Sequence, residues 1–255
     1  MSDSTLQTVD RALIVLEALA EKPMTAVQIQ NQLGLNKSTI HRLLMTLLSR
    51  GFVERNNTSG VYTIGLKLVE ISSIRLNNIE LKTEASPYLR KLTETLKQPS
   101  QLATYDNGEA IYIEKINNVH YMRMYSQIGR RIPVHCSAVG KALVMDKSDE
   151  EILNILNLIP MKAYTHKTLM TKEAVLEEIK IARQKGFAID NEEHEKGIFC
   201  IAVPIYDYRG QIIAAISTAG ENNTFLTDDK SEIVNQIKFT ANKISHRMGF
   251  VNSII

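Results

Sequence analysis

Apolar residues recur three and four positions apart through the first fifty residues, which is the spacing of amphipathic helices. A first helix is expected to end before Pro23. Its apolar stripe comprises Val9, Ala12, Leu13, Leu16, Leu19 and Ala20. Thr25 and Gln28 in "TAVQ" have the spacing of a capping box, so a second, short helix is expected to begin there and to stop at Gly34.

A third helix is expected from its N-cap residue Asn36 to Arg50. Its apolar stripe comprises Ile40, Leu43, Leu44, Leu47 and Leu48. Two helices joined by a tight glycine-containing turn form a helix-turn-helix, whose second helix enters the major groove of DNA. The β-prone runs 52–55 and 61–64 flank the turn-forming residues "NNTSG" and predict a hairpin wing. Residues 5–67 are therefore expected to form a winged helix-turn-helix.

Residues 66–81 carry more apolar positions than one face of a water-exposed helix needs. We expect a connector helix at 68–81, with a break at Asn77–Asn78 and a second helix that continues to Leu96. The extra apolar residues fit two alternatives, which remain open: contact with a partner chain in a dimer, or burial within one chain.

Beyond Pro99 the pattern changes to short strands between helices. Hairpins are expected around 106–108 and 207–210, and a further strand at 120–126. Helices are expected at 137–145, 149–156, 172–185 and 228–248. Antiparallel strands with separate helices indicate an α+β domain at 82–252, in which helices cover one sheet.

Composition narrows the functional classes only modestly. The net charge of the 255 residues is +2, so an argument for nucleic acid has to be local. The two cysteines show no disulfide pattern, the first ten residues show no secretory signal, and no apolar run approaches the roughly 20 residues of a membrane span. We expect a cytoplasmic protein without a membrane partner.

The start of the third helix carries the local argument. Its first turn has no acid, although the helix dipole favours negative charge there, and residues 36–55 hold four basic residues against one acid. We expect DNA phosphates near the helix N-terminus and base edges along its outward face. The candidate DNA-binding residues are Thr25, Asn36, Lys37, Ser38, Thr39, His41, Arg42 and Arg55. A solvated helix face without a DNA partner is the alternative.

Several stretches resemble IclR-type transcriptional regulators. "TVDRALIVLEALA", "GLNKSTIHRLLMTLLSRGFVER" and "YTIGLKLVEI" are similar to the family's N-terminal domain. "RIPVHCSAVGKALV" and "GFAIDNEEHEKGIFCIAVPIYDYRGQIIAAISTAG" are similar to its effector-binding domain. The resemblance implies a DNA-binding regulator, usually a repressor and usually a homodimer or homotetramer, with a C-terminal effector-binding domain of GAF-like fold.

The resemblance also implies an effector site. Its residues here are Met124, Ala138, Val139, Asp190, Cys200, Ser217 and Ala219. Physically, "HCSAVGK" offers backbone N–H groups at a helix start to a carboxylate, and Ser217 adds a hydroxyl. Ala219 departs from the pattern, because a second serine often occupies this position, and the loss of that donor leaves the ligand's identity open. Small residues on tightly packed strands are the alternative reading.

Other chemistry receives little support from the sequence. The acidic stretch "DNEEHE" at 190–195 is expected to be mainly solvated surface, with a pocket rim as the next alternative. His135, Cys136, His194 and Cys200 lack the spacing of a zinc site, and no catalytic or cofactor fingerprint occurs. We therefore expect no catalytic residues, metal or cofactor.

The sequence thus predicts a regulator that binds double-stranded operator DNA near genes of small-molecule catabolism, most simply a repressor, and that responds to a small organic acid. The alternative is a ligand-binding or enzymatic domain whose N-terminal helices serve protein association only.

Overall fold

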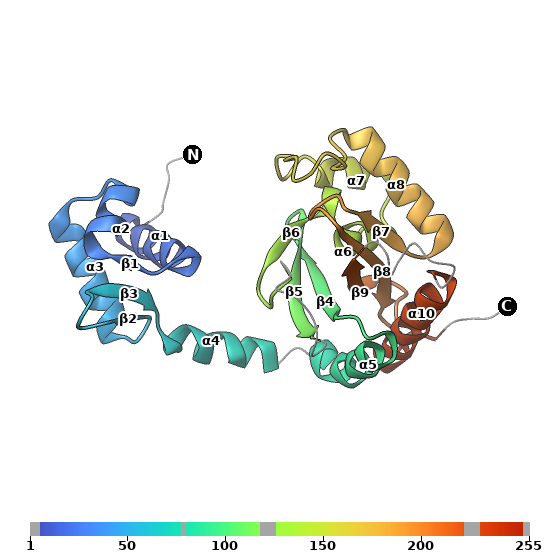
Figure 1. Cartoon of the computed structure of the whole chain (residues 1–255), viewed down its shortest axis with the longest axis horizontal. Helices are drawn as coiled ribbons and strands as arrows, with labels where there is room; N and C mark the ends of the chain where they lie inside the picture. Colours follow the sequence, from blue (N-terminus) through green and yellow to red (C-terminus); the bar gives the residue numbers. More distant parts are fainter. Residues whose placement is uncertain (1–5, 78–79, 118–125, 222–229, 252–255) are drawn as a thin grey trace. The chain divides into compact units, whose positions relative to one another are not determined.

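The computed structural model describes residues 6–77, 80–117, 126–221 and 230–251, and Figure 1 shows its helices and strands. The chain divides into two compact units, with the boundary between residues 78 and 79. We call them the N-terminal and the C-terminal unit and describe each by itself. The strand expected at 120–126 lies, apart from Ser126, outside the described residues.

In its described residues, the N-terminal unit consists of four helices and a small antiparallel sheet with strand order β1-β3-β2. Its elements are α1 (Gln7–Glu21), β1 (Met24–Thr25), α2 (Ala26–Leu33), α3 (Lys37–Ser49), β2 (Val53–Arg55), β3 (Val61–Ile64) and α4 (Leu66–Asn77). The predicted capping box is present, because Thr25 N–H donates to Gln28 Oε1 at 2.8 Å and Gln28 N–H to Thr25 Oγ1 at 3.3 Å. The winged helix-turn-helix is confirmed.

The core of this unit forms where α1, α2 and α3 meet the wing. Ile29 of α2 and Ile40 and Leu44 of α3 are 0–2% exposed, as the helical stripe predicted. The predicted stripe of α1 was wrong in part: Val9 and Leu13 are each 53% exposed, whereas the buried residues are Val15, Ala18 and Leu19. Apolar residues occupy more than half of the circumference of α1, so periodicity alone did not show which part its neighbours cover.

The C-terminal unit is an α+β domain, as predicted, built on one antiparallel sheet of six described strands. Its elements are α5 (Glu80–Leu96), β4 (Ser100–Asp106), β5 (Glu109–Ile116), β6 (Arg131–Pro133), α6 (Ala138–Leu143), α7 (Asp149–Ile155), α8 (Lys172–Lys185), β7 (Ala188–Asn191), β8 (Ile198–Tyr206), β9 (Ile212–Glu221) and α10 (Lys230–Arg247). The strand order is β6-β5-β4-β9-β8-β7. Both predicted hairpins and all four predicted helices are present; β6 and β7 were not predicted.

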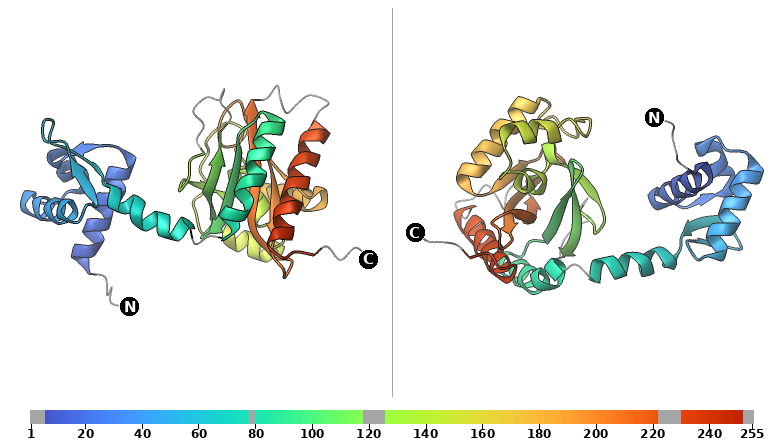
Figure 2. Two further views of the ribbon diagram at one scale, coloured as in Figure 1. Left: turned by 90° about the horizontal axis from the view of Figure 1, so that it is seen from below. Right: turned by 180° about the vertical axis from the view of Figure 1, so that it is seen from behind.

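Two apolar layers cover the two faces of this sheet. α5 and α10 lie side by side on one face, and α6, α7 and α8 lie on the other (Figures 1 and 2). Side chains alternate between the faces, so that Leu102 and Ile216 meet α5 and α10, whereas their neighbours Ala103 and Ala215 point to the side of α6. Large residues thus fill one side, and small residues leave space on the other.

Candidate DNA interface and ligand pocket

The N-terminus of α3 is capped by a side chain and carries no negative charge. Asn36 Oδ1 accepts hydrogen bonds from the N–H of Thr39 and the hydroxyl of Ser38, both at 2.8 Å. The first turn contains no acidic residue. The positive end of the helix dipole therefore points to solvent uncompensated, which favours an anion there.

The polar face of α3 lies opposite its buried stripe. Lys37, Ser38, His41 and Arg42 are exposed, and Thr39 is half-buried. The predicted base-reading and phosphate-binding side chains therefore share one outward surface.

The wing adds a further exposed cation. Arg55 of β2 is exposed, and its guanidinium lies 5.7 Å from the centre of the Tyr62 ring. Asn56 closes the turn of the wing, because its Oδ1 accepts the N–H groups of Thr58 at 2.9 Å and Ser59 at 3.0 Å. Thr25, in contrast, commits its hydroxyl to the capping box of α2.

A pocket lies in the C-terminal unit, on the side of the sheet that faces α6, and its space of about 430 Å³ includes open solvent. It is lined by Gln101, Tyr112, Ser126, Ile132, Ser137, Ala138, Val139, Asp190, His194, Glu195, Ile198, Cys200, Ser217 and Ala219. Six of the seven predicted effector residues are among them, and Met124 lies outside the described residues.

Small side chains on adjacent strands create this space. Ser217 and Ala219 face the pocket from β9, whereas Ile216 packs on the other side of the sheet, and Cys200 faces Ala219 in the register of β8 and β9. The start of α6 closes the pocket with Ala138 and Val139, whose N–H groups have no acceptor within the helix. The Ser137 hydroxyl is occupied, since it donates to Pro133 O at 2.8 Å and accepts from Gly140 N–H at 3.2 Å.

Asp190 supplies a buried carboxyl group to the pocket. It stands on β7 and is 3% exposed, and its Oδ1 accepts the N–H of Glu193 at 2.7 Å. Burial, and then the negative charge of Glu193, raise its pKa to about 7, although the N–H groups of Glu193 and His194 act in the opposite direction. At neutral pH the Asp190 carboxyl group is therefore present in both its protonated and its ionised form.

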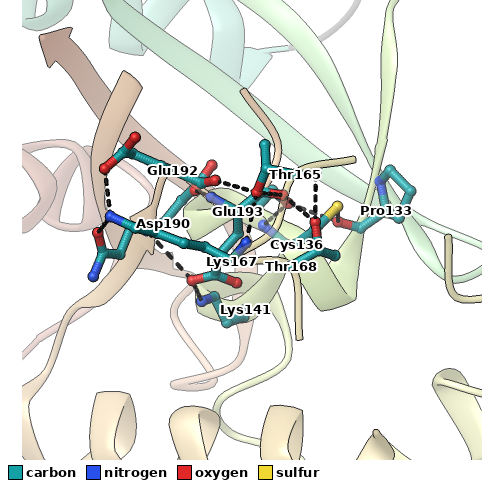
Figure 3. Close-up of polar contacts among 12 residues, drawn as sticks. Pro133, Cys136, Lys141, Thr165, Lys167, Thr168, Asp190, Glu192 and Glu193 are labelled. Carbon is teal, nitrogen blue, oxygen red and sulfur yellow. Dashed lines mark hydrogen bonds and ion pairs between the residues drawn. The ribbon is translucent and has the colours of Figure 1, made fainter. Parts of the chain in front are cut away.

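The acidic turn, which we define as residues 190–194, has three buried carboxyl side chains, so the expectation of a mainly solvated surface was wrong. Asp190, Glu192 and Glu193 are 3–8% exposed. Lys141 of α6 compensates the charge of Glu193, with Nζ 2.7 Å from Glu193 Oε1, and Lys167 pairs with Glu192 (Figure 3). Cations from distant parts of the chain make the burial of these carboxylates tolerable.

The segment 162–169 covers the acidic turn. Thr165 Oγ1 donates to the carbonyl oxygen of Glu192, and Thr168 Oγ1 donates to that of Glu193, each at 2.6 Å (Figure 3). The rings of Tyr164 and His194 lie 4.7 Å apart. His194, which lines the pocket, is therefore packed against this covering segment.

Two paired strands carry a polar link that the sequence reasoning missed. Gln101 of β4 stands opposite Ser217 of β9, and the Ser217 hydroxyl donates to Gln101 Oε1 at 2.9 Å. Gln101 Nε2 lies 3.4 Å from Ser126 Oγ. The available signal was the position of Gln101 between Ser100 and Leu102 in a predicted strand, where a polar side chain that is buried needs a partner.

The thiols and imidazoles do not assemble a metal centre. Within the described ranges no group of three or more His, Cys, Asp and Glu side chains is placed to hold a metal ion. Burial raises the pKa of the thiols of Cys136 and Cys200, so both are protonated at neutral pH. Burial also lowers the pKa of His135, whose Nε2 atom lies 3.1 Å from the carbonyl oxygen of Lys162. In the same part of the chain, no helix combines the length and apolar character of a membrane span.

Comparisons with known proteins match both units. A family model described as "Bacterial transcriptional regulator IclR C-terminal" matches residues 74–246, and one described as "IclR helix-turn-helix domain" matches 8–57. The HTH-type transcriptional regulator KdgR of Dickeya chrysanthemi is 35% identical over 237 residues, covering 92% of this chain and 78% of that protein. The transcriptional repressor IclR of Escherichia coli K12 is 34% identical over 229 residues, covering 88% and 83%.

A solved structure agrees with the fold. An IclR homologue from Microbacterium hydrocarbonoxydans, in complex with 4-hydroxybenzoate, superposes with a TM-score of 0.81 at 24% sequence identity. The match covers 94% of this chain and 98% of that one. At this identity the likeness shows a shared fold.

Proposed function

The chain belongs to the IclR family of bacterial transcriptional regulators, which are not enzymes, and from this premise we propose that it represses an operon of small-molecule catabolism in the cytoplasm. A small organic acid in the pocket of the C-terminal unit modulates its binding to double-stranded operator DNA. The name of the E. coli relative supports a repressor, and the bound 4-hydroxybenzoate of the Microbacterium homologue supports an organic acid.

The exposed face of α3 carries the proposal. Lys37 and the positive end of the helix dipole address phosphates, and Ser38, His41 and Arg42 address base edges. Arg55 adds a phosphate contact from the wing. The hydroxyl of Thr25 acts indirectly, by fixing the start of the helix that precedes α3.

The proposed effector binds with its carboxylate near the N–H groups of Ala138 and Val139. Asp190, Cys200 and Ser217 form walls of the pocket, and these walls contact the remaining part of the effector. Such a ligand shifts DNA affinity only as far as it binds two arrangements of the regulator with different affinity.

Regulators of this family typically oligomerise, and we propose a homodimer or homotetramer. Exposed apolar residues at the start of α4 support contact with a second copy: Leu66 is 73%, Val69 58% and Ile71 46% exposed. Light scattering coupled to size-exclusion chromatography measures the state directly.

A gel-shift titration with DNA from upstream of the gene tests the function. Binding that neutralises six to ten phosphates weakens about 10³- to 10⁵-fold between 50 and 200 mM salt. We expect such a steep loss for the upstream DNA, and weaker binding for an unrelated fragment of the same length. A complex that forms equally well at all salt concentrations, or no complex at all, contradicts the proposal and favours an N-terminal unit that serves protein association.

A further inference from the structure

Gln101 spans the wall of the pocket between two serines. It is 2% exposed, and its side-chain amide accepts from Ser217 Oγ at 2.9 Å and faces Ser126 Oγ at 3.4 Å. A primary amide has two N–H donors and two lone pairs on its oxygen. These two contacts use one of each, so the amide keeps a second donor and a second acceptor for a molecule in the pocket.

The bond to Gln101 fixes what Ser217 can offer a ligand. A hydroxyl has one hydrogen to donate and two lone pairs. Because the hydrogen of Ser217 points to Gln101 Oε1, its oxygen meets the pocket with lone pairs. A carboxylate placed there is repelled, whereas a ligand hydroxyl donates favourably. The sequence expectation that Ser217 supplies a donor therefore changes: Gln101 turns Ser217 into an acceptor.

The rest of the lining has the same bias. The acids Asp190 and Glu195 line the pocket, and among the lining residues that the structure describes none is a lysine or arginine. Asp190 also uses its Oδ1 to accept the N–H of Glu193. Walls rich in acceptors and poor in cations match a ligand that presents several O–H groups, and match a purely apolar or purely anionic ligand badly.

We propose that Gln101 is the specificity-determining residue of this pocket and that it selects a small carboxylic acid whose carbon chain carries hydroxyl groups. The inference rests on the proposed function of the pocket as the effector site. Gln101 acts through direct contact with a ligand hydroxyl and through the orientation that it imposes on Ser217.

Thermal unfolding of the full chain with three acids tests this selection: D-gluconate, hexanoate of the same carbon number without hydroxyls, and 4-hydroxybenzoate. A ligand that binds only the native state raises the melting temperature by mass action. For the wild type we expect gluconate to raise it at concentrations where hexanoate and 4-hydroxybenzoate have little effect. For Gln101→Met we expect the same rise in melting temperature to need about ten-fold more gluconate, because hydrogen bonds to the ligand are lost.

Gln98→Met is the matched control. Gln98 is also a buried glutamine, 8% exposed, but it does not line the pocket, and its Oε1 has no hydrogen-bond partner among the described residues. We expect its gluconate response to equal that of the wild type. Ser217→Ala is the second test variant if Gln101→Met unfolds, and it is expected to weaken gluconate similarly while leaving hexanoate unchanged.

The outcomes separate clearly. A wild type that responds equally to hexanoate, only to 4-hydroxybenzoate, or to none of the three acids overturns the hydroxylated class. An unchanged ratio between gluconate and hexanoate in Gln101→Met overturns the role of Gln101, because a merely structural residue weakens both acids alike. Binding of the ligand-free wild type to DNA is measured in parallel. If the wild type does not bind DNA, the proposed function is refuted. If it binds DNA but shows none of the expected ligand responses, only the proposed selection of the ligand is refuted.

Discussion

Lys141 is a charged side chain that the fold buries almost completely. It is 1% exposed, and its ammonium donates to Glu193 Oε1 at 2.7 Å. A buried ion pair is a weak source of stability, but removal of one partner leaves an uncompensated charge in a medium of low dielectric constant. The pair therefore holds the acidic turn beside α6, because separating the two side chains would leave each buried charge without its counter-ion.

We expect Lys141→Met to lower the free energy of unfolding by about 3–5 kcal/mol, because Glu193 remains buried without its cation. The double variant Lys141→Met/Glu193→Leu is expected to recover most of this loss. Urea denaturation curves measure both changes. Lys180→Met is the control, since Lys180 and Asp149 form a solvent-exposed pair at 3.0 Å that contributes little to stability. Equal effects of the two single variants contradict the argument.

The recognition helix gives a second prediction for single residues. If Arg42 makes a bidentate contact with a base, Arg42→Ala weakens operator binding by about 1–3 kcal/mol and relaxes the sequence preference. Lys37→Ala is expected to weaken binding to all DNA alike and to lower the salt slope by roughly one. Gel shifts with operator and unrelated DNA distinguish the two effects.

Arg90→Ala and Lys91→Ala remove the same charges from exposed positions on α5 and serve as controls. If Lys37→Ala loses the sequence preference and Arg42→Ala keeps it, Lys37 contacts the base and Arg42 the phosphate, contrary to our assignment.

Long-range partners limited what the sequence predicted about single residues. The cap at Asn36 was predictable, because its partner Thr39 is three residues away. The burial of Glu193 was not, because its cation stands 52 residues earlier in the chain. The link between Gln101 and Ser217 spans 116 residues and was missed for the same reason.

At the scale of elements, the backbone that enters the wing after α3 and the backbone that leaves it before α4 make an unusually close contact. A Cβ atom built on Gly65 lies 2.2 Å from the carbonyl oxygen of Gly51, a distance that real side chains do not adopt. The neighbouring hydrogen bonds hold the two strands of backbone together, because Gly65 N–H donates to Phe52 O at 2.9 Å and Lys67 N–H to Gly51 O at 3.2 Å. Glycine is thus required at position 65 because no side chain fits between the two backbone segments.

Gly65→Ala is expected to destabilise the N-terminal unit by about 1–3 kcal/mol or more, because backbone atoms have to move apart. Gly34→Ala provides the contrast: its φ of +63° disfavours a side chain, but no atom lies within 4 Å of the added Cβ. Its cost is expected to stay near 1–2 kcal/mol. Thermal unfolding compares the two variants, and a smaller loss for Gly65→Ala than for Gly34→Ala contradicts the steric argument.

Length and flanking turn signals together decided which elements the pattern predicted. α3, α8 and α10 have 13, 14 and 18 residues, long enough for helical periodicity to show. β2 and β3, of three and four residues, were predicted because turn-forming residues lie between them. β6 and β7 have the same lengths but lie next to segments with other signals, so no alternation was visible. The acidic turn was misread because β7 places Asp190 in the sheet, where neighbouring elements cover it.

At the scale of the whole molecule, two groups of the pocket, the buried Asp190 and the partly buried His194, give opposite dependences of stability on pH. Asp190, with its pKa raised from 3.8 to about 7, holds a proton in the folded state that the unfolded chain has lost. Its contribution to stability therefore falls as the pH rises from about 4 to 7. His194, with its pKa lowered from 6.5 to about 4 chiefly by burial, contributes stability that increases over almost the same range.

Comparison with Asp190→Asn isolates the carboxyl group. The variant lacks its titration, so we expect the stability of the variant relative to the wild type to increase between pH 4 and 7, by up to roughly 1.4 kcal/mol per pH unit. Urea denaturation at a series of pH values measures this difference. A difference that is constant with pH shows that Asp190 titrates normally.

The order of strands in the six-stranded sheet also governs when each part of the protein can form during translation. The buried core of the N-terminal unit draws on residues up to Tyr62, so it can assemble soon after this segment leaves the ribosome. The C-terminal unit has to wait, because β4 pairs with β9, near the end of the chain, and α10 covers the same face as α5. Until Ser217 has been synthesised, Gln101 lacks its partner and one wall of the pocket is missing. Each new molecule therefore completes its candidate DNA-reading surface before the site that is proposed to control it.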